Sequence, residues 1–126
     1  MKPPDRSIDV LTLLGNPMPM QALLRQLHEE GIHVDVATSL ADARQLFFGS
    51  GGHDCVVVAP DVPPGLAQQV LRSLRTVDPE LPTASFGPDV RRADAPTRTA
   101  MLAGFHPSSR AGAGALLRFL RGLRRR

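Results

Sequence analysis

The segment Cys55-Val56-Val57-Val58-Ala59 decides the fold, because it is short, rich in β-branched residues and apolar throughout. A strand of a parallel sheet that is buried on both faces gives every side chain of such a segment an apolar environment. Pro60 ends the strand, since proline has no backbone N–H to donate to a neighbouring strand. The sequence therefore predicts a parallel sheet that is covered by helices on both sides.

The residues on either side of this strand alternate between strand-like and helix-like patterns. Further strands are predicted over residues 8–14, 32–37 and 83–86. Helices are predicted between them by apolar residues at helical spacing, with Asn16 and Ser39 as capping residues of the first two. Strands that alternate with helices in this way are typical of α/β proteins with a parallel sheet.

The last third of the chain is harder to interpret. A helix is expected over residues 95–103, and a fifth strand over residues 105–109 in spite of Pro107. A final helix follows, because four leucines share one face of the pattern: Leu116, Leu117, Leu120 and Leu123. We expect a single domain over residues 8–123, with an extension at 1–7 and a basic end at 124–126.

The length and composition predict one domain that folds without a disulfide or a structural metal ion. The chain has 126 residues, of which 42% are hydrophobic, and a single cysteine, Cys55, which cannot form a disulfide within the chain. No export signal and no run of about 20 apolar residues is present. The four histidines do not fall at metal-ligand spacings. We therefore expect a cytoplasmic protein that binds no metal or cofactor and does not contact a membrane.

The net charge of +3 conceals a division along the chain. Residues 1–90 contain six Lys and Arg against eleven Asp and Glu, a formal charge of −5, whereas residues 91–126 contain nine Arg and one Asp, a formal charge of +8. Such an asymmetry marks either a solvated basic face or a contact surface for an acidic partner. The candidate contact residues are Arg91, Arg92, Arg98, Arg110, Arg118, Arg121 and Arg125.

Several segments of the sequence have the pattern of a known family. The segments Gly31-Ile32-His33-Val34-Asp35-Val36-Ala37-Thr38-Ser39, Ala41-Asp42-Ala43, His53-Asp54-Cys55-Val56-Val57-Val58 and Val62-Pro63 resemble the receiver domain of bacterial response regulators. This resemblance implies a flavodoxin-like (βα)5 three-layer sandwich, whose parallel five-stranded sheet has the order 2-1-3-4-5. It also implies a place in two-component signal transduction.

The family's chemistry requires residues that this chain lacks. In receiver domains an Asp at the end of the third strand accepts a phosphoryl group beside a Mg²⁺ ion held by two acidic residues, and a Thr or Ser and a Lys respond to the new charge. The resemblance places Ala59 at the phosphorylated position. The other positions hold Leu14 and Gly15 for the acidic pair, Gly87 for the hydroxyl and Arg110 for the lysine, and Ser108 is the nearest match to the family's aromatic residue.

These substitutions predict a degenerate receiver, or pseudo-receiver, rather than an enzyme. We expect a protein-interaction module that is independent of phosphorylation, serves bacterial signalling or cell organisation, and binds a partner that is acidic at the contact or a second copy of the chain. One alternative is nucleic-acid or anion binding through the Arg-rich C-terminal third. The other is an atypical receiver phosphorylated at Asp61, although a loop Asp of this kind is more often simply solvated.

Overall fold

Five strands and four α-helices make up the part of the chain that the computed structural model describes, residues 8–91 and 98–123. The strands are β1 (Asp9–Leu13), β2 (His33–Ala37), β3 (Cys55–Val58), β4 (Thr83–Ser85) and β5 (Thr99–Met101). The helices are α1 (Gln21–Glu29), which follows a 3₁₀ turn at Met18–Met20, α2 (Leu40–Ser50), α3 (Pro64–Leu74) and α4 (Arg110–Leu123). No helix within the described residues is long and apolar enough to cross a membrane.

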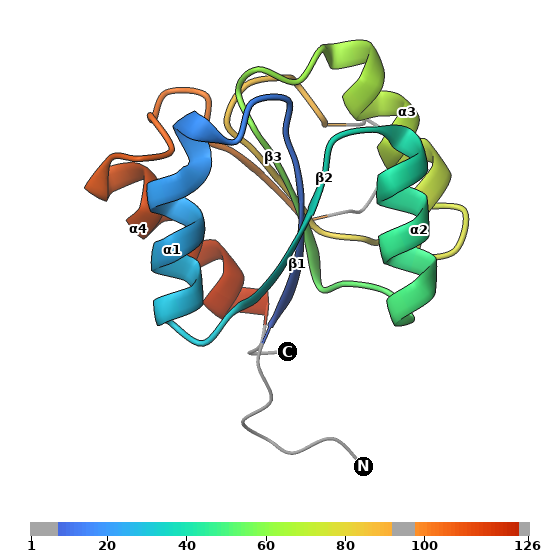
Figure 1. Cartoon of the computed structure of the whole chain (residues 1–126), viewed down its shortest axis with the longest axis horizontal. Helices are drawn as coiled ribbons and strands as arrows, with labels where there is room; N and C mark the ends of the chain where they lie inside the picture. The colour runs from blue at the N-terminus through green and yellow to red at the C-terminus, as the bar shows by residue number, and fades with distance from the viewer. Residues whose placement is uncertain (1–7, 92–97, 124–126) are drawn as a thin grey trace.

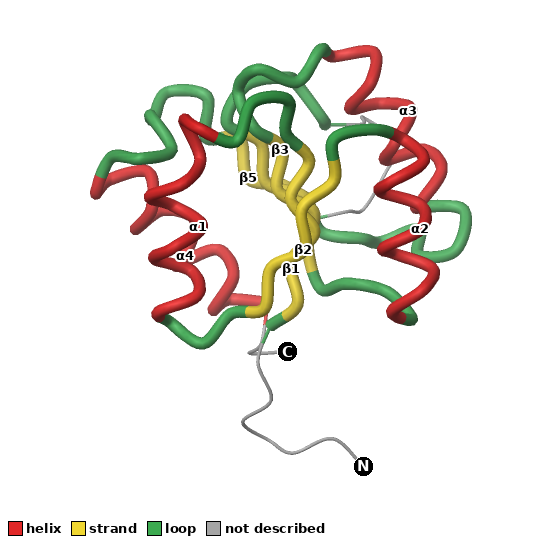
Figure 2. The backbone as a smooth tube through the Cα atoms, viewed as in Figure 1, coloured by secondary structure: helices red, strands yellow, loops and turns green. Residues whose placement is uncertain are grey.

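The strands form one parallel sheet in the order β2-β1-β3-β4-β5. Helices α1 and α4 cover one face of this sheet, and α2 and α3 cover the other (Figure 1). The tube in Figure 2 shows the sheet as a twisted layer between the two helical layers. The predicted flavodoxin-like three-layer sandwich and its strand order are therefore confirmed.

The central strand β3 lies in the middle of the core, as its apolar sequence predicts. Every residue from Cys55 to Ala59 is fully buried. Burial raises the pKa of the Cys55 thiol far above its ordinary value, chiefly because the thiolate would lose its hydration. Cys55 is therefore a packing residue with an unreactive thiol.

Local sequence signals set the helix boundaries. The Ser39 hydroxyl accepts a hydrogen bond from the backbone N–H of Asp42 at 3.1 Å, which caps the start of α2 as predicted. The helix ends at Gly51, whose φ of +82° lies in the left-handed region that glycine tolerates best. The final helix also follows the prediction, because Leu116, Leu117 and Leu120 are buried against the sheet.

The expected strand over residues 105–109 is wrong, and so is the expected helix over residues 95–103 from residue 98 onward. Residues 95–97 lie outside the described residues. Residues Thr99–Met101 form β5, which pairs with β4, and the backbone N–H of Leu102 donates to Ser85 O at 2.7 Å. Residues 105–109 form the loop before α4. The helix-favouring residues Ala100 and Met101 adopt a strand because the buried β4 needs a hydrogen-bonding neighbour on its second edge.

Candidate functional site

The residues at the receiver positions meet at the carboxyl ends of β1, β3 and β4. Leu14 follows β1 and Ala59 follows β3, and both are buried with 1% and 0% of their surface exposed. The backbone fixes both positions, since the N–H of Leu14 donates to Ala37 O at 3.0 Å and that of Ala59 donates to Leu13 O at 2.9 Å. The two positions that the resemblance matches to receiver carboxylates are therefore occupied by buried apolar side chains.

Gly87, which follows β4, lies directly against the loop after β3. A Cβ atom added to Gly87 would lie 2.8 Å from both the Cα and the carbonyl oxygen of Pro60. Nearby, the Ser85 hydroxyl donates to Pro88 O at 2.6 Å and accepts from the N–H of Gly87 at 3.2 Å. The backbones of the two loops therefore touch, and no side chain stands between them at Gly87.

Asp61 reaches from the loop after β3 to the loop after β1. Its carboxylate accepts a hydrogen bond from the backbone N–H of Gly15 at 3.2 Å and another from that of Asn16 at 2.7 Å. A Cβ atom on Gly15 would lie 2.8 Å from Asp61 Oδ2, so glycine provides the room that this contact needs. We call this pair of hydrogen bonds the Asp61 clamp.

The Asp61 clamp is the feature of the site that sequence reasoning missed. The sequence indicates that Asp61 turns into the loop, but not that its carboxylate returns to β1. Its nearest signal is Gly15-Asn16 after the first strand, where small residues leave backbone N–H groups accessible. Asn16 keeps the loop in place through its side-chain oxygen, which accepts from the N–H of Met18 at 3.0 Å.

The site contains no metal cradle of the receiver kind. Residues 8–91 and 98–123 contain no group of three or more His, Cys, Asp or Glu side chains that could hold a metal ion. Asp61 is exposed, and its two oxygens are already directed at backbone N–H donors. A carboxylate attacks a phosphoryl group efficiently only where a cation neutralises the charge of that group.

The structure does not place Arg110 where the family's lysine belongs. That match depended on a fifth strand over residues 105–109, whereas β5 ends at Met101 and is followed by Leu102 and Ala103. Arg110 is instead the exposed first residue of α4. Ser108 lies in the loop before α4, where its hydroxyl is 2.6 Å from His106 Nδ1, so it is not a strand residue either.

Three of the candidate contact arginines already have partners within the chain. Arg91 forms two hydrogen bonds with the Asp89 carboxylate, at 3.0 and 3.1 Å, and this lowers the pKa of Asp89 to about 2. Arg121 forms an ion pair with Glu30 at the end of α1, and Arg98 donates to Gly122 O at 3.1 Å. These contacts reduce the positive charge that is free to meet a partner.

Arg118 lies on the exposed side of α4, beside the outer strand of the sheet. Together with Arg98 it lines a shallow depression of about 350 Å³, and Thr99, Phe119 and Gly122 complete the wall. Phe119 thus adds an aromatic side chain to a depression that two arginines line. Arg92 and Arg125, the remaining candidates, lie outside the described residues.

Comparisons with known proteins give the fold a family context. No family model and no curated protein sequence matches the chain. Among solved structures, the chain is similar to a response regulator receiver protein from Sinorhizobium medicae, with a TM-score of 0.68 and 19% identity over 94% of each chain. A two-component response regulator from Clostridium difficile is similar with a TM-score of 0.69 and 16% identity, over 95% of this chain and 98% of that one.

The same fold also matches part of a larger protein of another kind. Lysine decarboxylase A from Pseudomonas aeruginosa is similar with a TM-score of 0.62 and 20% identity, over 94% of this chain but only 19% of that chain. The chain therefore has the fold of response regulator receiver domains. At these identities the likeness shows the fold alone, so the function has to be argued from the site.

Proposed function

We propose that the protein is a pseudo-receiver, a signalling module that has the receiver fold but acts by binding a protein partner and without phosphorylation. The observation that carries the proposal is the Asp61 clamp beside the buried Ala59. A carboxylate of the chain itself occupies the backbone donors at the carboxyl end of the sheet. The loops after β1 and β3 are therefore joined by hydrogen bonds of the chain itself.

This arrangement supports one fixed state rather than a switch. A receiver responds to phosphorylation because a new charge reorients nearby loops. Here the residues after β5, Leu102 and Ala103, carry no charge, and Gly87 has no hydroxyl that could follow a phosphoryl group. The Asp61 clamp holds the two loops in one arrangement. In this proposal the signal is carried by binding to the partner and not by a change of conformation.

The contact surface that we propose lies on the outer edge of the sheet, over β5 and α4. Arg98 and Arg118 border one depression there, and Arg118 has no ion pair among the described residues. A partner that is acidic at this point would gain association rate from the charges and affinity from contact with Phe119. A second copy of the chain meets this description through its acidic residues 1–90.

The decisive experiment measures intact mass after the protein is incubated with acetyl phosphate and Mg²⁺. We expect no added phosphoryl group, while an authentic receiver in the same reaction gains one. A stable adduct that disappears in Asp61→Asn but persists in the matched surface variant Asp78→Asn would contradict the proposal. That result would establish the alternative of an atypical receiver phosphorylated at Asp61.

Partner binding is tested separately, by capture from the native host with wild type and Arg118→Glu. We expect the charge reversal to remove an acidic protein from the captured set. The control is Arg72→Glu on α3, which is exposed and belongs to the helical layer on the opposite face of the sheet from α4 (Figure 1). Identical captured sets for the three proteins would place the interface elsewhere.

Nucleic-acid or anion binding remains the second candidate function, and the depression between Arg98 and Arg118 favours it. Guanidinium groups bind phosphates, and an aromatic ring such as Phe119 can stack on a base. Binding of this kind weakens steeply as salt rises, because counterions are released on association. A titration of single-stranded oligonucleotide at several salt concentrations distinguishes it, since a protein interface with an apolar centre keeps most of its affinity.

A further inference from the structure

A second concave surface lies at the opposite end of the sheet, where β1 and β3 begin. It encloses about 450 Å³, a volume typical of small-molecule sites. Its walls come from the end of α2, the glycine turn that follows it and the loop after α3. We call it the amino-end pocket, and its lining residues are Asp9, Phe47, Phe48, Gly51, Gly52, His53, Asp54, Val77 and Asp78.

One wall of the amino-end pocket is aromatic and well packed. The Phe47 ring stacks on the His53 ring with 5.7 Å between centroids and 23° between planes, and Phe48 meets Phe47 edge-on at 5.5 Å. Phe48 and Val77 are 42% and 65% exposed, respectively. Large apolar side chains that are exposed beside a pocket are typical of sites where a ligand covers them.

Carboxylates give the pocket its charge. Asp9, Asp54 and Asp78 line it, and the lining contains no Lys or Arg. Asp54 Oδ2 accepts a hydrogen bond from the backbone N–H of Asp9 at 2.8 Å, which holds the starts of β1 and β3 together. The side chain of Asp78 has no hydrogen bond or ion pair among the described residues, so its charge is available to a ligand.

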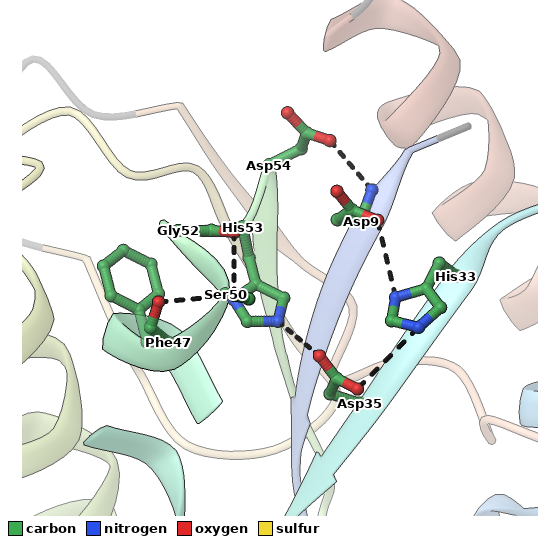
Figure 3. Close-up of polar contacts among 8 residues, drawn as sticks. All are labelled: Asp9, His33, Asp35, Phe47, Ser50, Gly52, His53 and Asp54. Atoms are coloured by element: carbon green, nitrogen blue, oxygen red, sulfur yellow. Dashed lines mark hydrogen bonds and ion pairs between the residues drawn. The ribbon is translucent and has the colours of Figure 1, made fainter. Parts of the chain in front are cut away.

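A His–Asp network joins His53 of the pocket lining to Asp35 and His33 on β2 and to Asp9 on β1 (Figure 3). His53 Nε2 lies 2.8 Å from Asp35 Oδ2, and His33 lies between Asp35 and Asp9, with its Nδ1 atom 3.4 Å from Asp9 Oδ1. A neutral His53 that donates from Nε2 keeps Nδ1 as an acceptor. This Nδ1 atom is buried and has no hydrogen-bond partner, which leaves one polar atom of the pocket wall unsatisfied.

We propose that the amino-end pocket binds an organic cation, a guanidinium or ammonium group carried on an apolar stem. The carboxylates neutralise its charge, and Phe48 and Val77 cover the stem. The chain already uses this chemistry once, because the Arg44 guanidinium lies 5.6 Å from the Phe48 ring centroid, outside the pocket lining. The ligand is either a free small molecule or an Arg or Lys side chain of another protein. This inference does not depend on the proposed function.

The test is an NMR titration of the full chain with n-butylguanidinium and, as a neutral analogue of similar shape, n-butylurea. We expect saturable shifts of the backbone amides of Gly51, Gly52 and Asp78 with the cation and none with the urea. A second arm uses a short capped peptide with one Arg. Saturation by the peptide as well indicates a protein side chain as the natural ligand, and saturation by the free cation alone indicates a small molecule.

Two variants separate the pocket from general charge attraction. Asp78→Asn should weaken the binding of n-butylguanidinium about two- to fivefold, the range of a partly exposed ion pair. Glu80→Gln, which removes the same charge two residues away and outside the pocket lining, should leave Kd unchanged. The proposal fails if neither cation produces saturable shifts, if n-butylurea produces the same shifts, or if both variants weaken binding equally.

Discussion

The two ends of the parallel sheet use acidic residues in opposite ways. At the carboxyl end Asp61 is held by two backbone N–H groups, and its neighbours Leu14 and Ala59 are buried and apolar. At the amino end Asp9, Asp54 and Asp78 surround an open pocket with aromatic walls. Open α/β sheets usually bind ligands at the carboxyl end. The comparison teaches that the acidic group at the carboxyl end is part of the chain's own hydrogen bonding, whereas the acidic groups at the amino end line a pocket.

The largest effect should come from restoring a carboxylate to the closed end. Ala59→Asp places a charge at a position with no exposed surface, so we expect the free energy of unfolding to fall by about 3 kcal/mol at neutral pH. Urea denaturation measures the loss. Because burial raises the pKa of such a carboxyl, the deficit should shrink as pH falls. A midpoint equal to that of wild type would mean that the carboxyl end is open, and Ala59→Ser controls for the change of side chain.

Gly87→Ala should have the next largest effect. The added Cβ meets the backbone of Pro60 at 2.8 Å, and a backbone cannot move aside as easily as a side chain. We expect a loss of about 2 kcal/mol in the free energy of unfolding, within the range for overpacked sites. Gly65→Ala is the matched control, because nothing lies within 4 Å of the Cβ position there. Equal midpoints for the two variants would show that the loops at Gly87 separate readily.

Gly15→Ala should lower the free energy of unfolding by less, about 1 kcal/mol. Its added Cβ meets the end of a side chain, Asp61 Oδ2, and not a backbone. The cost should nearly vanish when Asp61 is already Ala, since the two residues then no longer compete for space. A double-mutant cycle in urea measures this coupling. Strictly additive effects would mean that the Asp61 clamp does not form in solution.

The fold follows from the sequence wherever the signal is local. The segment from Cys55 to Ala59 and the helix cap at Ser39 are predicted correctly, because burial on both faces and capping leave their mark within a few residues. Strand β5 has only three residues, and Ala100 and Met101 favour helices. Its conformation depends on pairing with β4, which no local pattern records.

The same reason limits what the sequence says about sites. The apolar residues Leu14 and Ala59 predict a site without acidic groups, but the Asp61 clamp joins Gly15 to a residue 46 positions away. For the amino-end pocket the sequence contains one indication, because Asp9 and Asp54 lie at the starts of the first and third predicted strands. Parallel neighbours bring such residues to the same edge. Asp78 and Phe48 join them only through the packing of α2 and α3.

At the amino end, removal of a carboxylate from the pocket should leave the free energy of unfolding almost unchanged. Asp78→Asn should change the free energy of unfolding by less than about 0.5 kcal/mol, because the Asp78 side chain has no partner among the described residues. Urea denaturation of this variant and of Ala59→Asp compares the loss in the free energy of unfolding at the two ends of the sheet. A loss near that of Ala59→Asp would show that Asp78 is a structural residue and would count against a ligand site.

The smallest effect belongs to the exposed carboxylate of Asp89, in the loop that follows β4. The Arg91 side chain, through its hydrogen bonds, lowers the pKa of Asp89 to about 2. A lowered pKa in the folded state adds stability above the ordinary pKa of Asp, and this is lost as pH falls toward 2. In Arg91→Gln the pKa of Asp89 should rise toward its ordinary value, which a carboxyl-detected NMR titration measures. The melting temperature at neutral pH should fall only slightly, because the pair is exposed and screened. An unchanged pKa would mean that Arg91 is free in solution, and it would then join Arg118 among the cations open to a partner.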